Sequence, residues 1–213
     1  MTYVLYGDKG SGAFAVEAAL AEAGVCYAIQ IISLERNEQK LPGFRAINPS
    51  GKIPALRLPE GGEIVTESAA ILLTLADRHP EAGLLPDAGS AARAQAYRWI
   101  AYMQSEIYPM VEIVDYPERF CPVGADAGAI REKARARVRE RFAVIEDVIA
   151  GPWLLKCGFS AADIYVAMFS RWSLGPGWRE AHLPKVCALA EVLSERSRIA
   201  PVWQRHFGET AFP

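Results

Sequence analysis

The first 32 residues carry the pattern that most restricts how this chain folds. Tyr3 to Tyr6 is a short β-prone run, and Cys26 to Ile32 is a second apolar run. Between them, Ala13 to Ala23 is rich in Ala, Leu and Glu and ends at Gly24, a residue that commonly terminates helices. A strand, a helix and a second strand joined by short connections predict a βαβ unit.

A different group of elements follows this unit. Leu41 to Ile47 is long enough for one or two helical turns, and Glu67 to Arg78 has a helical composition. Two strand-sized runs, Ala55 to Leu58 and Glu63 to Val65, flank Pro59-Glu60-Gly61-Gly62, which predicts a hairpin turn. The predicted order through residue 79 is therefore β-α-β, a break, and β-β-α.

The rest of the chain predicts helices. Residues 80–90 contain two prolines and two glycines, as an inter-domain linker often does. After them, apolar residues recur at helical spacing in four segments: Ala91 to Glu118, Ala127 to Ile149, Ala161 to Trp172 and Pro184 to Arg196. Pro109 must kink or end the first of these helices. We expect a first domain over residues 1–79 and an all-helical domain over residues 91–213.

Charge and cysteine usage exclude several classes of partner. The chain has 23 Lys and Arg against 25 Asp and Glu, so it lacks the basic excess that nucleic acids and anionic membranes attract. Its four cysteines stand far apart and it has three histidines, so zinc-site spacings are absent and we expect no metal. No apolar stretch approaches the ~18 residues of a membrane span, and no signal-like segment opens the chain. We expect a cytoplasmic protein with reduced thiols.

The glycine-rich corner after the first run has three interpretations. Gly7 and Gly12 have the spacing of a phosphate-binding P-loop, but Ala13 and Phe14 follow where that motif needs Lys and Ser or Thr. Residues 10–15 fit the dinucleotide motif G-x-G-x-x-A, with Glu35 at the distance of a ribose-binding acid. The rest of the chain lacks the further βαβ units that a dinucleotide site needs. The third interpretation is that Ser11 caps the following helix.

Three further stretches carry a resemblance to a known family. They are Asn48-Pro49-Ser50-Gly51-Lys52-Ile53-Pro54-Ala55-Leu56, then Thr66-Glu67-Ser68-Ala69-Ala70-Ile71-Leu72, and later Phe159-Ser160-Ala161-Ala162-Asp163-Ile164. Together they closely resemble the cytosolic glutathione transferases, in order and over essentially the whole chain. The resemblance implies an α/β thioredoxin-like N-terminal domain and an all-α C-terminal helical domain. It also implies glutathione as co-substrate and conjugation of its thiolate to small hydrophobic electrophiles.

The resemblance assigns glutathione-binding roles in the first domain. It implies a cis peptide bond before Pro54 that turns the backbone of Ile53 toward the cysteinyl amide of glutathione; without it, a trans proline that starts an edge strand is the commoner case. Glu67 and Ser68 open a helix whose N-terminus favours an anion, and they would hold the γ-glutamyl end. They could equally serve only to stabilise that helix. Lys52 and Gln39 match positions that contact the glycine carboxylate.

Ser11 is the predicted catalytic residue. Aligned from Leu5-Tyr6, it resembles the catalytic hydroxyl of the serine-type transferases, the theta and delta kind, in a bacterial-style member; Tyr6 is a weaker second candidate. Lowering a thiol pKa of about 8.5 by ~2 units takes ~2.7 kcal/mol, and one hydroxyl donor to a charged sulfur contributes ~1.5 to 3 kcal/mol. Gly12-Ala13-Phe14 departs from the usual residues after this serine. Gly12 stands where beta-type enzymes keep a cysteine, which excludes mixed-disulfide chemistry here.

The second domain carries three further predictions. Ser160 and Asp163 form a capping box with a structural role only. The resemblance implies an electrophile pocket lined by aromatic and aliphatic side chains, for which the candidates are Tyr102, Met103, Tyr108, Val111, Tyr116 and Trp172. The same spacing is typical of an ordinary helical core. Residues 175–178 resemble a loop that could cover the pocket, and the run from Arg131 to Arg141 indicates a solvated helix face.

Assembly and activity also follow from the resemblance. It implies a homodimer in which Gln104 reaches the glutathione of the partner. Two other functions stay open from the sequence: a catalytically silent relative that binds glutathione or a protein partner, and a glutathione-dependent isomerase of a small keto acid, which would use the same activated thiol.

Overall fold

The structure is a computed structural model that describes residues 2–208. Its contacts divide the chain into two compact units, of which unit 1 comprises Met1–Leu85 and Ser194–Pro213, and unit 2 comprises Pro86–Leu193. The helical domain was expected to span residues 91–213. That expectation is wrong for residues 194–208, because this segment belongs to unit 1.

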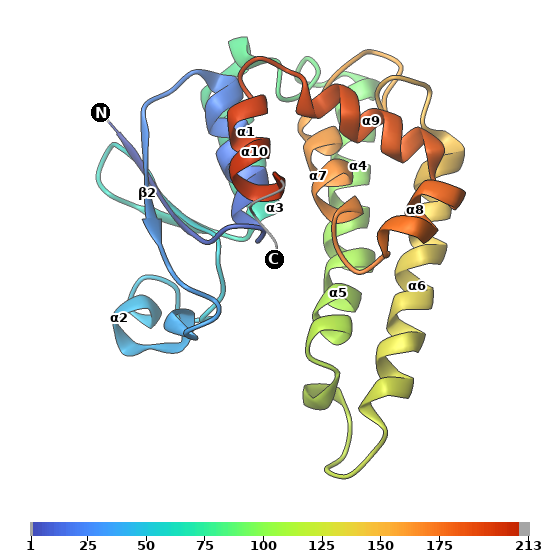
Figure 1. Ribbon diagram of the computed structural model, residues 1–213. Coiled ribbons are helices and arrows are strands. Elements are labelled where there is room, and N and C mark those ends of the chain that lie inside the picture. Colours follow the sequence, from blue (N-terminus) through green and yellow to red (C-terminus); the bar gives the residue numbers. More distant parts are fainter. Residues whose placement is uncertain (1, 209–213) are drawn as a thin grey trace. The chain divides into compact units, whose positions relative to one another are not determined.

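Unit 1 is built on a four-stranded mixed sheet. Its strands are β1 (Tyr3–Gly7), β2 (Tyr27–Ile31), β3 (Ala55–Arg57) and β4 (Ile64–Thr66), in the order β2-β1-β3-β4 (Figure 1). β1 runs parallel to β2, with Leu5 opposite Ile29, while β3 runs antiparallel to both β1 and β4. The predicted thioredoxin-like arrangement is confirmed.

The helices of unit 1 are α1 (Ala13–Ala23), α2 (Pro42–Arg45), α3 (Ser68–Arg78) and α10 (Ala200–Phe207), with short 3-10 turns at Glu38–Lys40 and Pro80–Ala82. On one face of the sheet, Tyr6 and Ala55 form a core cluster with Ile32 of the following loop and Phe44 of α2. Because side chains alternate along a strand, Leu5 and Leu56 point to the opposite face, where α1 and α3 lie side by side (Figure 1).

Helix α1 is apolar except for two glutamates, and nine of its eleven residues are buried. A helix of this kind must be covered all round, and α1 lies against the sheet, α3 and α10. The ring of Phe14 packs against Trp203 and Phe207 of α10, with centroids 5.6 and 4.8 Å apart. The sequence analysis did not predict α10.

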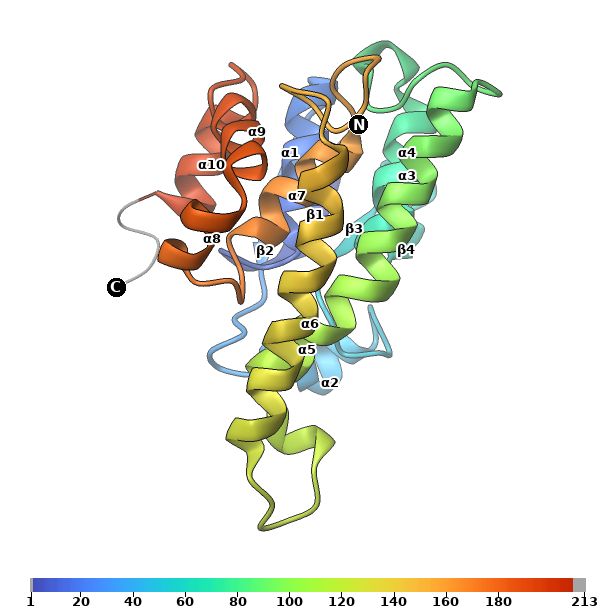
Figure 2. The same ribbon diagram turned by 90° about the vertical axis from the view of Figure 1, so that its right-hand side faces the viewer.

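Unit 2 is all-helical, as predicted. It contains α4 (Ala91–Tyr102), a π-helical turn (Met103–Ile107), α5 (Tyr108–Asp115), a 3-10 turn (Pro117–Phe120), α6 (Ala127–Val148), α7 (Ala161–Ser170), α8 (Pro176–His182) and α9 (Pro184–Ser194). The long helices α5 and α6 lie side by side (Figure 2), and every residue of α7 is buried. Pro109 interrupts the first helix as predicted, because it stands in the first turn of α5, directly after the π-helical turn.

Two predictions for unit 2 are wrong in detail. Residues 175–178 do not form a loop, because Pro176 starts α8 directly after Gly175, whose φ of 78° breaks the preceding chain. The arginines of α6 are not simply solvated. Arg131 donates to the carbonyl of Val114 in α5. Arg135 and Arg139 donate to the carbonyls of Ser173 and Leu174, which follow α7. These arginines therefore bond α6 to α5 and to the segment after α7.

Candidate functional site

The loop before β3 is held by the side chain of Asn48, which is almost fully buried. Its Nδ2 donates to the carbonyl of Lys52 at 2.6 Å, and its Oδ1 accepts from the amide and hydroxyl of Ser50 at 3.1 and 2.9 Å. Gly51 takes a φ of 61°, and its carbonyl accepts from Nζ of Lys40 at 2.8 Å. These contacts show that the Asn-Pro-Ser-Gly-Lys motif forms a turn, and that the turn holds the main chain in place just before Ile53.

The chain leaves this turn at Ile53. The peptide bond between Ile53 and Pro54 is cis, as the resemblance implied. Ile53 is half-buried, and within residues 2–208 no hydrogen bond between main-chain groups involves it. β3 begins only at Ala55. The amide and carbonyl of Ile53 are therefore available to an extended peptide.

Glu67 and Ser68 stand at the start of α3. The helix begins at Ser68, one residue later than predicted, and Glu67 precedes it with φ 63° and ψ 110°. Positive φ is uncommon for a residue with a side chain, and such strain is concentrated at ligand sites. Ser68 is buried, whereas Glu67 is exposed. The first N–H groups of an eleven-residue helix lie at the same point and carry partial positive charge.

Gln39 lies in the 3-10 turn beside this loop and is 5% exposed. Its Oε1 is buried without a hydrogen-bond partner, and its Nε2 lies 3.5 Å from Oδ1 of Asn37. An unsatisfied buried polar atom costs about 1 to 3 kcal/mol, so a carboxamide in this state is suited to a ligand. A Cβ placed on Gly51 would lie 3.0 Å from the carbonyl oxygen of Gln39, so the structure brings the two loops together.

Ser11 is 8% exposed and its hydroxyl makes two contacts. It donates to the carbonyl of Asp8 at 2.7 Å and accepts from the amide of Ala13 at 3.2 Å. Ser11 thus bonds to the first amide of α1, although the N-cap position itself is Gly12 and has no side-chain cap bond. A hydroxyl has one proton, so Ser11 must turn from Asp8 before it can donate to a sulfur.

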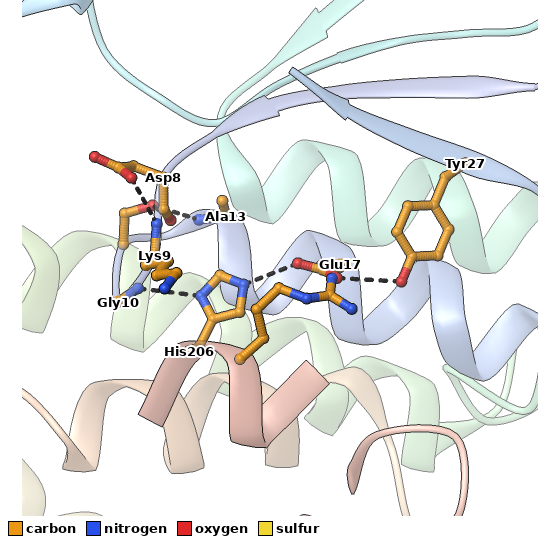
Figure 3. Close-up of polar contacts among 9 residues, drawn as sticks. Asp8, Lys9, Gly10, Ala13, Glu17, Tyr27 and His206 are labelled. Atoms are coloured by element: carbon orange, nitrogen blue, oxygen red, sulfur yellow. Dashed lines mark hydrogen bonds and ion pairs between the residues drawn. The ribbon is translucent and has the colours of Figure 1, made fainter. Parts of the chain in front are cut away.

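Sequence reasoning missed the groups that hold this corner in place. The carboxylate of Asp8 accepts from the amides of Lys9 and Leu34 at 2.9 and 2.8 Å, which ties the end of β1 to the loop after β2. The amide of Gly10 donates to Nδ1 of His206 at 3.1 Å. Figure 3 shows His206 between the Gly10 loop and Glu17 of α1.

Glu17 is 1% exposed and is surrounded by donors. Its Oε2 lies 2.8 Å from Nε2 of His206, while its Oε1 accepts from the Tyr27 hydroxyl at 3.2 Å and pairs with Arg205. Burial, with a smaller contribution from Arg205, lowers the pKa of His206 to about 4, so the ring is neutral near pH 7. Because Nδ1 accepts from Gly10, the proton lies on Nε2 and is donated to Glu17.

The predicted electrophile-pocket residues are distributed over unit 2. Met103 and Val111 are buried core residues. Tyr108 and Trp172 do come together, with ring centroids 5.8 Å apart, and both pack on Phe169.

The remaining predicted residues of this unit have partners of their own. The Tyr102 hydroxyl lies 3.4 Å from the carbonyl of Arg141, and Tyr116 lies under the guanidinium of Arg119. Gln104 accepts through Oε1 from the Tyr165 hydroxyl at 3.0 Å. Of the six pocket candidates, only Tyr108 and Trp172 share an aromatic cluster.

The start of α7 contains the predicted capping box. Asp163 accepts through Oδ2 from the amide and hydroxyl of Ser160, at 2.7 and 3.1 Å, and through Oδ1 from the amide of Leu154 at 2.7 Å. Burial raises the pKa of Asp163 to about 6, although these hydrogen bonds oppose the shift. Phe159 packs on Trp153 with centroids 5.4 Å apart.

Comparisons with known proteins identify the family. The family model of the glutathione S-transferase N-terminal domain matches residues 13–78. The solved structure of a glutathione transferase homolog from Sulfitobacter, with bound glutathione, is 30% identical over 94% of this chain and 96% of its own, with a TM-score of 0.87. The chain belongs to the glutathione transferase family. The uncharacterized GST-like protein YncG of Escherichia coli K12 is 26% identical over 95% of this chain and 97% of its own.

A further relative carries the name of an isomerase. The maleylacetoacetate isomerase of Pseudomonas aeruginosa PAO1 is 27% identical over 74% of both chains. Within residues 2–208 of this family member, no group of three His, Cys, Asp or Glu is placed to hold a metal ion. In the same described residues, no helix is long and apolar enough to cross a membrane.

Proposed function

We propose that this family member binds glutathione in unit 1 and transfers its thiolate to a small hydrophobic electrophile. The observation that carries the proposal is the open main chain of Ile53, held between the Asn48 turn and the cis bond to Pro54. An extended tripeptide needs such an edge for its cysteinyl amide groups. The similarity to the Sulfitobacter homolog, whose structure contains glutathione, supports the same ligand.

The ends of glutathione find complementary groups on either side of this edge. The γ-glutamyl carboxylate meets the Ser68 hydroxyl and the N–H groups at the start of α3, and the γ-glutamyl ammonium meets Glu67. The glycine carboxylate meets the ammonium of Lys52 and the amide of Gln39. The bond to this carboxylate comes from the nitrogen of the Gln39 carboxamide, whose contact with Oδ1 of Asn37 is long at 3.5 Å, because the oxygen of the carboxamide can only accept.

The proposed chemistry is nucleophilic attack by a bound thiolate. The Ser11 hydroxyl exchanges its bond to the Asp8 carbonyl for one to the sulfur anion. A bond to a charged acceptor contributes about 1.5 to 3 kcal/mol and the neutral bond given up contributes about 1 kcal/mol. The net gain lowers the thiol pKa by roughly one unit, and the α1 N-terminus adds to it. The thiolate then forms a carbon–sulfur bond and either adds to the electrophile or displaces a leaving group.

Replacement of Ser11 tests this role. Ser11→Ala should keep the affinity for S-hexylglutathione within about threefold and raise the pKa of bound glutathione by roughly one unit. The thiolate absorbance is followed against pH in protein saturated with glutathione. Ser90→Ala is the matched control, because Ser90 belongs to unit 2 and accepts from the amide of Arg93 at the start of α4. An identical titration in both variants would remove Ser11, and with it the serine-type assignment, from the mechanism.

Turnover separates this proposal from its alternatives. We expect S-hexylglutathione to bind and 1-chloro-2,4-dinitrobenzene to be conjugated. Binding without conjugation of any halide favours a silent glutathione-binding relative. The similarity to a maleylacetoacetate isomerase supports a second candidate, glutathione-dependent isomerisation of a small keto acid, which is tested with maleylacetoacetate itself. Failure to bind S-hexylglutathione would refute all three.

We also propose that the protein acts as a cytoplasmic homodimer in detoxification. Light scattering measures the dimer directly. Gln104 retains its predicted role toward the partner's glutathione, although its Oε1 already accepts from Tyr165. In a confirmed dimer, Gln104→Ala should weaken glutathione binding, whereas the aromatic pair Tyr108 and Trp172 should affect only the electrophile.

A further inference from the structure

The C-terminal helix α10 contacts the glycine-rich corner through a single polar side chain. His206 is 2% exposed and lies between the loop at Gly10 and the carboxylate of Glu17 (Figure 3). Its Nδ1 accepts from the Gly10 amide at 3.1 Å, and its Nε2 donates to Glu17 at 2.8 Å. The ring also packs edge-on against Phe14, with centroids 5.5 Å apart. Both ring nitrogens are therefore bonded, and the ring is also packed against an aromatic side chain of α1.

Gly10 is the point at which the corner turns. Its φ is 63°, and Ser11 and the first turn of α1 follow directly. Within residues 2–208, the amide of Gly10 has no main-chain partner, so the imidazole of His206 is what fixes it. In the same part of the chain, the amides of Ser11 and Gly12 make no hydrogen bond, and they stay available to an anion at the start of α1.

We propose that His206, held in one orientation by Glu17, is a positioning residue for the thiolate site. By fixing the Gly10 amide, it aims the Ser11 hydroxyl and the free amides at the start of α1 toward one sulfur atom. The inference rests on the proposed function, and it assigns a part of the glutathione site to the last helix of the chain. His206 itself does not touch glutathione.

The surrounding charges keep this contact intact near neutral pH. Glu17 is shared by the Tyr27 hydroxyl and Arg205, which hold its carboxylate in place. Asp8 and Lys9 are the other charged groups close to the ring, on the loop that precedes Gly10. A neutral imidazole can accept from an amide, whereas a protonated one cannot. The contact therefore requires the neutral tautomer that this environment favours.

Two substitutions separate the two contacts of the ring. In His206→Asn, the side-chain oxygen takes the approximate position of Nδ1 and keeps an acceptor for Gly10. In His206→Gln, the longer amide keeps a donor for Glu17 and loses the acceptor for Gly10. We expect His206→Gln to raise the pKa of bound glutathione by about one unit, which lowers kcat/KM near pH 7 by roughly threefold to tenfold. His206→Asn should retain the wild-type titration, and affinity for S-hexylglutathione should change less than about threefold in both variants.

A third variant controls for the packing of α10. Val202 is buried on the same helix and has no polar side-chain atom to bond to the corner, so Val202→Ala should lower the melting temperature without moving the thiol titration. Equal titrations of His206→Gln and wild type would overturn the inference and leave the proposed function standing. If the wild-type protein itself fails to bind S-hexylglutathione, the proposed function falls and the inference falls with it.

A measurement on the unmodified protein keeps the inference testable if a variant does not fold. Amide hydrogen exchange of the wild type at pH 7 should be at least about tenfold slower at Gly10 than at Ser11 and Gly12, because only the first amide is bonded to a buried acceptor. Equal exchange at these three amides overturns the positioning role.

Discussion

The chain just before a helix is held in place by nearby residues at α7 and by a distant residue at α1. At α7, the buried carboxylate of Asp163 satisfies the amide and hydroxyl of Ser160 and the amide of Leu154, all within nine positions of the chain. At α1, the chain before the helix is fixed by His206, which is 196 positions away from Gly10. The donors that precede α7 are thus satisfied from within the same stretch of chain. His206 holds the Gly10 loop, while the amides of Ser11 and Gly12 in the described structure make no hydrogen bond.

This difference separates a structural helix start from a functional one. The positive end of a helix binds an anion only if its first N–H groups are not already occupied. α7 has a strong cap and is buried throughout, so its start contributes stability and specificity of packing. α1 gives up a complete cap at the corner where the proposed thiolate binds. The conformation of this corner therefore depends on the contacts that α10 makes with it.

Removal of Asp163 should have the largest effect on stability. Asp163→Ala leaves three buried donors without an acceptor, and at about 1 kcal/mol for each lost bond the free energy of unfolding should fall by about 3 kcal/mol. Asp163→Asn keeps one acceptor and should lose less. Urea unfolding gives the loss, and the thiolate titration of the surviving protein should stay at the wild-type value. A shifted titration would show that α7 takes part in the chemistry.

The pH dependence of stability should distinguish the two regions by sign. The pKa of His206 is lowered to about 4, so its contribution is present above pH 6.5 and is lost as the pH falls toward 4. The pKa of Asp163 is raised to about 6, so its contribution is present below pH 3.8 and is lost as the pH rises toward 6. Each change in the free energy of unfolding amounts to at most about 3 to 3.5 kcal/mol, and the two nearly cancel in the wild type.

Single substitutions should reveal each slope. His206→Asn should leave a protein whose stability falls as the pH rises from 4 to 6, and Asp163→Asn should leave one whose stability falls as the pH drops from 6 to 4. Urea denaturation at pH 4, 5, 6 and 7 measures both. Parallel curves for the two variants would contradict the assignment of opposite protonation behaviour to these sites.

The parts of this comparison that the sequence predicted are the local ones. The limits of α1 followed from its Ala- and Leu-rich composition and from Gly24, and the capping box followed from Ser160 and Asp163, because these signals act within a few positions. The turn before Pro54 is local in the same sense, since Asn48 bonds to residues two and four positions ahead, but only the family resemblance pointed to this stretch. Such contacts do not depend on how the rest of the chain folds.

The distant contacts could not be predicted in the same way. α10 is eight residues long, and its partner on α1 lies almost at the other end of the chain. One signal was available: Glu17 and Glu22 interrupt an otherwise apolar helix, so burial of that helix demands cations from elsewhere, which Arg205 and Arg196 supply. Periodicity also did not separate core from pocket, because Met103 and Tyr108 follow one pattern and only Tyr108 joins the aromatic cluster with Trp172.

The two glutamates of α1 offer the finest test, because they lie on the same helix and have different bonding partners. Glu17→Ala removes the partner of Arg205, Tyr27 and His206, and Glu22→Ala removes the partner of Arg196. Since both arginines are partly exposed and can rehydrate, each loss should cost about 2 kcal/mol, less than a fully buried pair would.

Only Glu17→Ala should also raise the pKa of bound glutathione, because it releases His206 and with it the Gly10 amide, whereas Glu22 bonds at the far end of the helix. Urea unfolding should therefore rank the two variants as equals while the thiolate titration separates them. If both variants shifted the titration equally, the corner would be responding to the general loosening of α10, and the specific path through His206 would be wrong.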